Sequence, residues 1–183
     1  MTRIAVFGSA GPKPGDSLYE ESRQLGKLLA EAGFDVITGG YMGTMAAVSQ
    51  GAVEAGGHTI GVTCKEIESW RPVGANEWIR EEWPAETLIE RLKLITHACD
   101  AALALPGGIG TLVEISLTWN QIVVQSYKPK PLIAIGPGWQ KTFQAFYEHL
   151  GEYTLNSFRQ WLEFAQNNEE ALLLLKNKLI ELR

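Results

Sequence analysis

Residues 101–114 read Ala101-Ala102-Leu103-Ala104-Leu105-Pro106-Gly107-Gly108-Ile109-Gly110-Thr111-Leu112-Val113-Glu114. The first five residues are apolar and predict a buried strand, and a helix is predicted to begin near Gly110. Three glycines between them let the backbone approach a ligand closely, and the free N–H groups at a helix start favour an anion. Thr111 adds a hydroxyl donor, and Glu114 lies one helical turn further on. This pattern indicates chemistry on a phosphorylated sugar or nucleotide; the alternative is a tight turn that binds nothing.

The spacing of this run separates it from two common phosphate-binding motifs. No Lys follows Gly110, as the P-loop would require. The run also comes after about three predicted strand–helix units, so it is not the dinucleotide fingerprint that follows a first strand. The run therefore matches neither motif, and its function has to be inferred from its own glycines, Thr111 and Glu114.

Strands and helices are predicted to alternate along the rest of the chain. Apolar runs predict strands at 3–8, 34–38, 58–63, 101–105, 131–135 and 160–164. Amphipathic patterns predict helices at 16–32, 44–55, 86–98, 110–125, 138–150 and 168–182. Asp16 or Ser17 is expected to cap the first helix and Asn168 the last.

This alternation predicts an α/β fold: a doubly wound, mostly parallel sheet between two helix layers, in a modified Rossmann-like three-layer arrangement. One nucleotide-binding domain over residues 1–183 is the simplest interpretation. Residues 64–84 contain Trp70, Trp78 and Trp83 and predict an irregular insertion. A lid over the site and an oligomer contact are both open interpretations of that segment.

Three glycine-rich turns follow predicted strands and should meet at one edge of the sheet. In parallel sheets, ligands bind at the carboxyl ends of the strands, near the point where the strand order reverses. One crevice for a nucleotide-like ligand is therefore expected. The turns contain Gly8-Ser9, Gly39-Gly40-Tyr41-Met42-Gly43 and Gly107-Gly108.

Composition narrows the class of protein. The chain has 183 residues, 45% hydrophobic and 20% charged, which is ordinary for a soluble globular protein. Its net charge of −5 argues against a nucleic-acid or anionic-membrane surface. No secretion signal or membrane-length apolar stretch is seen, so a cytoplasmic location is expected. The two cysteines and three histidines lack metal-ligand spacing, so no metal is expected.

Glu114 and Arg91 are the candidates for chemistry, and each has a plain alternative. A carboxylate near a phosphate can stabilise or trap an oxocarbenium-like ribosyl centre; otherwise Glu114 simply complements the dipole of its helix. Arg91 lies about two turns before the end of its predicted helix, from which a guanidinium could clamp a phosphate. Its alternative is a solvated helix face.

The residues of these motifs resemble the LONELY GUY family, formerly mislabelled as lysine decarboxylases. The family signature P-G-G-x-G-T-x-x-E is intact from Pro106 to Glu114, and Arg91 stands fifteen residues before Pro106, as in the family. The early Gly-Ser corresponds to Gly8-Ser9, and the turn G-G-x-x-G-x-M corresponds to residues 39–45. The similarity spans roughly residues 3–136. The chain departs from the usual M-H-x-R-K around Arg91, which leaves the base specificity open.

The resemblance implies a phosphoribohydrolase that converts a nucleoside 5′-monophosphate, such as AMP or a cytokinin riboside monophosphate, to free base and ribose 5-phosphate. It implies Glu114 and Arg91 as catalytic residues, no cofactor, and homodimers with sites near the subunit interface. The phosphate would lie on Gly107, Gly108, Gly110 and Thr111. The remaining substrate-binding positions implied are Gly8, Ser9, Gly39, Gly40, Gly43 and Met45.

Two other functions remain open. Related proteins with the same sheet carry molybdenum cofactor, whose pterin bears a phosphate; such a carrier needs the anion cradle but neither Arg91 nor Glu114. A regulatory nucleotide sensor related to DNA-processing proteins is the third interpretation. The presence of both charged residues favours the enzyme. We also expect Trp70, Trp78 or Trp83 to stack on the base or to close the site.

Overall fold

The computed structural model describes residues 1–182 and contains a seven-stranded, all-parallel sheet with the strand order β4-β3-β2-β1-β5-β6-β7. The order reverses between β1 and β5, which pair in register from Ile4 with Ala101 to Phe7 with Ala104. The doubly wound parallel α/β fold is therefore confirmed. The strands are β1 Arg3–Phe7, β2 Asp35–Thr38, β3 Thr59–Cys64, β4 Glu81–Ala85, β5 Ala101–Ala104, β6 Leu132–Ile135 and β7 Glu163–Ala165.

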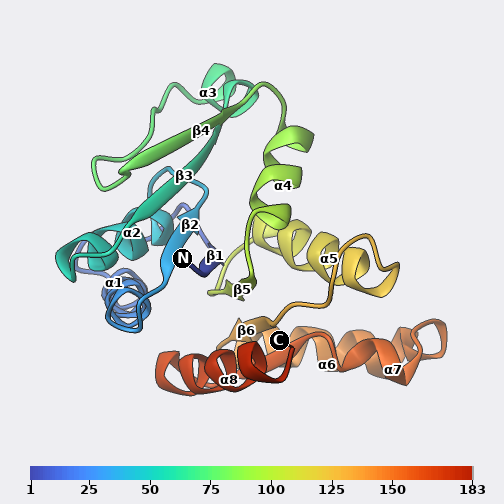
Figure 1. The fold of residues 1–183 in the computed structure, drawn as a ribbon. Coiled ribbons are helices and arrows are strands. Elements are labelled where there is room, and N and C mark those ends of the chain that lie inside the picture. Colours follow the sequence, from blue (N-terminus) through green and yellow to red (C-terminus); the bar gives the residue numbers. More distant parts are fainter. Residues whose placement is uncertain (183) are drawn as a thin grey trace.

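Two helix layers cover the sheet, and α1 and α2 lie on the other side of it from α4 and α5 (Figure 1). The alternation of side chains along a strand feeds both layers. Ile4 and Val6 of β1 pack with α1, α2 and α8, whereas Ala5 and Phe7 pack with α4, α5 and α6. The helices are α1 Ser17–Glu31, α2 Thr44–Glu54, α3 Lys65–Trp70, α4 Leu88–His97, α5 Ile109–Val123, α6 Pro137–Leu150, η1 Gly151–Tyr153, α7 Asn156–Arg159 and α8 Asn168–Glu181.

The expectation of an irregular segment over residues 64–84 is wrong at both of its ends. A short helix, α3, begins at Lys65, and β4 begins at Glu81 and pairs with β3. Glutamates and Pro84 hide β4 from the sequence pattern. They fit an edge strand, because such a strand faces water on one side and does not need every N–H in the ladder.

The predicted helix caps are also corrected. Asn167, not Asn168, caps α8, and its side chain accepts a hydrogen bond from the Glu170 N–H. Asp16 stands at the start of α1, but its carboxylate accepts from the Lys13 N–H (2.8 Å) instead of capping the helix. The hydrogen bonds of local turns thus decide which side chain caps a helix, and a capping pattern in the sequence does not show them.

Candidate active site

Arg91 lies in the first half of α4, which begins with a capping box between Thr87 and Glu90. Its side chain is buried and turns toward the sheet, because Nε donates to the Val62 carbonyl (2.8 Å) and Nη2 to the Gly39 carbonyl (3.2 Å). These carbonyls lie near the carboxyl ends of β3 and β2. The expectation that the Arg91 side chain reaches this edge of the sheet is confirmed. The alternative, that Arg91 lies on a solvated helix face, is wrong.

Glu114 lies in the second turn of α5 and is equally buried, with 7% of its surface exposed. Its Oε1 is 3.7 Å from Arg91 Nη1, so the two sequence candidates form a buried ion pair. Burial raises the pKa of Glu114 to about 7, and the Arg91 charge opposes this only in part. Within residues 1–182, no donor forms a hydrogen bond with the carboxylate, which leaves it sensitive to any charge brought alongside.

The guanidinium of Arg91 has N–H donors that form no hydrogen bond within residues 1–182. Nε and one N–H of Nη2 are bonded to carbonyls, while Nη1 has no hydrogen-bond acceptor in the described chain. A guanidinium carries five N–H donors in a fixed plane. The pair can thus offer donors and a carboxylate to the same ligand atom or to two adjacent ones.

The third glycine turn leads directly into α5. Gly108 stands at the N-cap position, and the Leu112 N–H donates to its carbonyl (3.0 Å), so the first N–H groups of the helix lack partners inside it. A side-chain carbon at Gly108 or Gly110 would meet no atom within 4 Å, so packing does not demand glycine there. At Gly107 such a carbon would overlap the buried Thr111 side chain, whose hydroxyl therefore lies beneath the turn.

The first two glycine turns are packed together. The Ser9 carbonyl accepts from Thr44 N (2.8 Å) and Thr44 Oγ1 (3.1 Å), which ties the end of β1 to the start of α2. Gly43 adopts a φ of +72°, and a side-chain carbon there would overlap the Ser9 carbonyl. Gly8 is confined in the same way by the Thr44 side chain.

The second turn also borders the ion pair. A side-chain carbon at Gly39 would overlap Arg91 Nη2 and press on the buried Met45 sulfur, so the arginine reaches its place across a glycine. Gly40 follows with a φ of +80°. The structure thus brings all twelve predicted site residues to the carboxyl edge of β1, β2 and β5, around the reversal of strand order.

Tyr41, which the sequence analysis did not single out, lies beside the ion pair. Its ring lies 5.7 Å from the Arg91 guanidinium, and the side chain is 2% exposed. Sequence spacing gave only an aromatic residue inside a glycine-rich turn, where small residues are usual. That departure is the one sequence signal that sets Tyr41 apart.

The three tryptophans of the 64–84 segment have different surroundings. Trp70 is 80% exposed, and Trp83 donates its indole N–H to Glu81 (2.7 Å) and lies under the Arg3 guanidinium. Trp78 lines a cavity of about 390 Å³ together with Met42. Stacking on a base stays a prediction, which Trp78 fits best.

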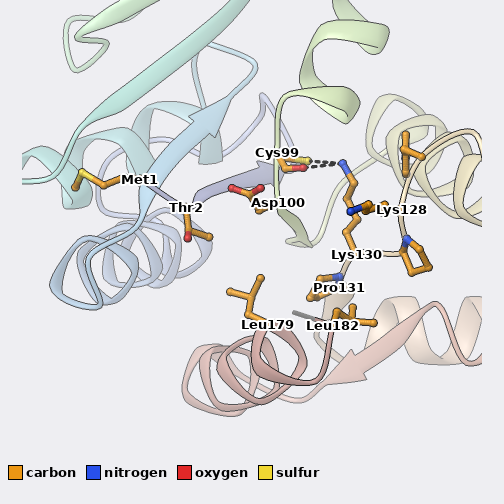
Figure 2. A pocket seen from close by; sticks show the side chains of 11 residues that line it. Met1, Thr2, Cys99, Asp100, Lys128, Lys130, Pro131, Leu179 and Leu182 are labelled. Atoms are coloured by element: carbon orange, nitrogen blue, oxygen red, sulfur yellow. Dashed lines mark hydrogen bonds between the residues drawn. The ribbon is translucent and has the colours of Figure 1, made fainter.

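A second cavity, of about 640 Å³, lies at the opposite edge of the sheet (Figure 2). The buried Lys130 ammonium donates there to the Thr96 carbonyl (2.8 Å), in the last turn of α4, and to the Cys99 carbonyl (2.6 Å), just beyond the helix. It also contacts the Cys99 sulfur (3.7 Å) and the Tyr127 ring. Since its three protons already have partners, this lysine stabilises a helix end rather than presenting a free charge.

Residues 1–182 contain neither a metal-binding cluster nor a membrane-spanning helix. Across residues 1–182, no group of three or more His, Cys, Asp or Glu side chains is placed to hold a metal ion. In the same part of the chain, no helix has the length and apolar character needed to cross a membrane.

The chain is similar to proteins of one family along most of its length. The model of the SLOG cluster4 family matches residues 1–152. A cytokinin riboside 5′-monophosphate phosphoribohydrolase of Arabidopsis thaliana is 36% identical over 138 residues, which cover 73% of this chain and 61% of that protein. One of Mycobacterium tuberculosis is 30% identical over 135 residues, covering 73% and 70%. The chain spans about six tenths of the length of the plant relatives it matches.

Solved structures with the same fold match nearly the whole chain. The molybdenum cofactor binding protein of Rippkaea orientalis has a TM-score of 0.75, 24% identity and 96% coverage of both chains. The molybdenum cofactor carrier protein of Chlamydomonas reinhardtii has a TM-score of 0.71 and 22% identity, covering 98% of this chain and 99% of that one. At these identities, the likeness concerns the Rossmann-like fold. With the intact signature, the match over residues 1–152 and the enzyme relatives taken together, the chain belongs to the SLOG cluster4 family and is a LONELY GUY (LOG) protein.

Proposed function

We propose that this protein hydrolyses the N-glycosidic bond of a nucleoside 5′-monophosphate, giving free base and ribose 5-phosphate. The observation that carries the proposal is the buried Arg91–Glu114 pair, 3.7 Å apart, beside the glycine turn that opens α5. The phosphoribohydrolases among its relatives support the same reaction.

The proposed chemistry assigns one task to each part of the site. The C1′–N bond breaks with its electron pair leaving on the base, and the Glu114 carboxylate stabilises the oxocarbenium-like ribosyl centre. A water oxygen then bonds to C1′, and its proton neutralises the departing base. The free donors of Arg91 hold substrate oxygens, while the 5′-phosphate lies on the N–H groups at the start of α5.

A chromatographic assay of base release from a panel of 5′-monophosphates tests the proposal. Glu114→Gln keeps the shape but loses the charge, and we expect kcat/KM to fall by about 100-fold or more. Glu54→Gln is the matched control, because this carboxylate also pairs with an arginine, Arg23, but lies on the surface away from the site. Equal activity of wild type and Glu114→Gln would refute the assigned role.

The carrier function remains the second candidate, because the molybdenum cofactor proteins match this chain from end to end, whereas the plant enzymes are matched over about six tenths of their length. A carrier would release no base from any nucleotide. It would still gain thermal stability from the phosphate-bearing cofactor, and Glu114→Gln would leave that gain unchanged.

We further infer a cytoplasmic homodimer. Ile89 on α4 and Ile109 on α5 are exposed by 74% and 77%, and Ile109 stands between two glycines of the proposed phosphate loop. A second copy covering this face would bury apolar surface next to the site. Sedimentation of wild type and Ile109→Glu tests it: we expect a dimer that the charge dissociates.

A further inference from the structure

We propose that Tyr41 is a positioning residue, whose ring holds the Arg91 guanidinium in the orientation that faces Glu114. The inference rests on the proposed function, because it assigns Tyr41 a part in the same site. Its basis is the position of a 2% exposed tyrosine ring, whose centroid lies 5.7 Å from the guanidinium carbon of the side chain that pairs with Glu114.

The hydroxyl of Tyr41 is anchored at the end of β3. It accepts a hydrogen bond from the Cys64 N–H (2.6 Å), and its proton faces the Cys64 carbonyl (3.2 Å) and Glu68 Oε1 (3.1 Å) on α3. Burial raises the pKa of Tyr41 to about 12, so the phenol stays protonated at physiological pH. The ring therefore stands on a fixed support in the sheet and in α3.

The backbone of Tyr41 is held from the opposite side. Asn76 Nδ2 donates to the Tyr41 carbonyl (2.7 Å) and to the Gly40 carbonyl (2.9 Å), and the Asn76 N–H also donates to Gly40 (2.8 Å). Two parts of the 64–84 segment thus clamp one residue. This gives the segment a purpose that neither a lid nor an oligomer contact requires.

The fixed position of the Tyr41 ring limits how the Arg91 guanidinium can move. Its hydrogen bonds in the described chain go to two carbonyls, Val62 and Gly39, and the buried Tyr41 ring occupies the space beside the guanidinium. Without the ring, Nη1 can leave Glu114. Among residues 1–182, Arg91 is the charge that lowers the pKa of Glu114, and the carboxylate then loses it.

The test compares Tyr41→Leu with Tyr41→Phe in the full chain. For Tyr41→Leu, we expect kcat to fall by about tenfold or more, KM for the 5′-monophosphate to change less, and the acidic limb of the pH profile to move upward. Tyr41→Phe keeps the ring, so its kcat and the position of its acidic limb should match those of wild type. Tyr127→Leu is the matched control, because Tyr127 also donates its hydroxyl to a backbone carbonyl, that of Thr118, and lies against a cation, Lys130, but at the far end of the strands from the site.

A folded Tyr41→Leu protein with wild-type kcat and pH profile would overturn the proposal, as would a Tyr41→Phe protein as impaired as Tyr41→Leu. If Tyr41→Leu does not fold, Asn76→Ala loosens the same turn from a half-buried position. Asn76→Ala should then move the acidic limb of the pH profile to higher pH, and an unchanged position of that limb would count against the inference.

A readout without turnover separates this inference from the proposed function. Carbon-13 NMR titration of Glu114 should show a higher pKa in Tyr41→Leu than in wild type, and no change in Tyr41→Phe. If wild type releases no base but the titration shifts as expected, the phosphoribohydrolase proposal fails and the positioning role stands. If base is released and the titration does not shift, the reverse holds.

Discussion

Glu114 is the residue whose environment sets the working pH of the proposed reaction. Its pKa is raised to about 7 by burial, so about half of the carboxyl groups are ionised at neutral pH. Stabilising a ribosyl cation requires the ionised form. We therefore expect kcat/KM to fall about tenfold per pH unit below the pKa and to level off above it. Initial rates of base release from pH 5 to 9 check this, and a flat profile would contradict it.

The same carboxyl group couples folding stability to pH. Its folded pKa of about 7 lies above the ordinary value of 4.5, so the folded state binds more protons between these values. The free energy of unfolding should then fall as pH rises, by up to about 1.4 kcal/mol per pH unit from this group. Glu114→Gln removes that loss, so its stability relative to wild type should increase from pH 5 to pH 8 in urea titrations. A constant difference would show that the carboxyl titrates normally.

The site could be predicted from sequence where spacing carries the information. The run to Glu114 predicted a site at the carboxyl ends of the strands, and the resemblance to the LONELY GUY family, through the interval from Arg91 to Pro106, added Arg91 to it. Tyr41 could not be found in this way, because its contact with Arg91 depends on the turn that Gly39 and Gly40 allow. Nor does spacing reveal that burial outweighs the arginine in setting the pKa of Glu114.

At the scale of elements, α4 carries Arg91 and depends on its first turn. Thr87 Oγ1 accepts from the Glu90 N–H (3.2 Å), and the Glu90 carboxylate accepts from the Thr87 N–H (3.1 Å). Thr87→Ala should lower the free energy of unfolding by about 1 kcal/mol. Thr142→Ala is the control, because this exposed threonine only bonds back to the Gly138 carbonyl within α6. Equal losses in urea denaturation would argue against the capping box.

The other end of α4 depends on Lys130, as Figure 2 shows for its contact with Cys99. Lys130→Met would remove the ammonium donor from the Cys99 carbonyl and leave the Thr96 carbonyl with only the weak donor of the Cys99 thiol, at a cost of about 2 kcal/mol. Lys128→Met changes an exposed neighbour in the same cavity and should be nearly neutral. Thermal unfolding of the two variants checks the difference, and similar melting temperatures would remove the role given to Lys130.

Strands with an apolar run were predictable, including the edge strand β7, whereas the edge strand β4, which lacks such a run, was not. The apolar runs predicted six of the seven strands: five of these are almost wholly buried, and β7 is half-buried with Ala165 fully buried. β4 escaped, since its glutamates and Pro84 belong to an edge that packs one face only. The cap of α8 was displaced by one residue, because Asn167 and Asn168 offer the same side chain to the same helix start.

At the scale of the whole molecule, the alternation of strands and helices determined the doubly wound arrangement, but not how closely its layers approach. α1 and α2 are adjacent in the helix layer and pack through Gly26 and Gly51. A side-chain carbon at Gly26 would overlap the Val48 carbonyl, and one at Gly51 would overlap the Arg23 carbonyl. Backbone touches backbone here, a contact that a hydrophobic pattern does not encode.

This contact leads to a prediction about the fold itself. Gly26→Ala must push α2 away from α1, and we expect a loss of about 3 kcal/mol in the free energy of unfolding, although alanine favours helices. Gly138→Ala, in the first turn of α6, meets no atom within 4 Å and should be neutral or slightly stabilising. Because the first alanine already separates the helices, Gly26→Ala with Gly51→Ala should cost less than the sum of the two single changes. Strict additivity in urea denaturation would mean that the helices do not move as units and that each alanine is accommodated locally.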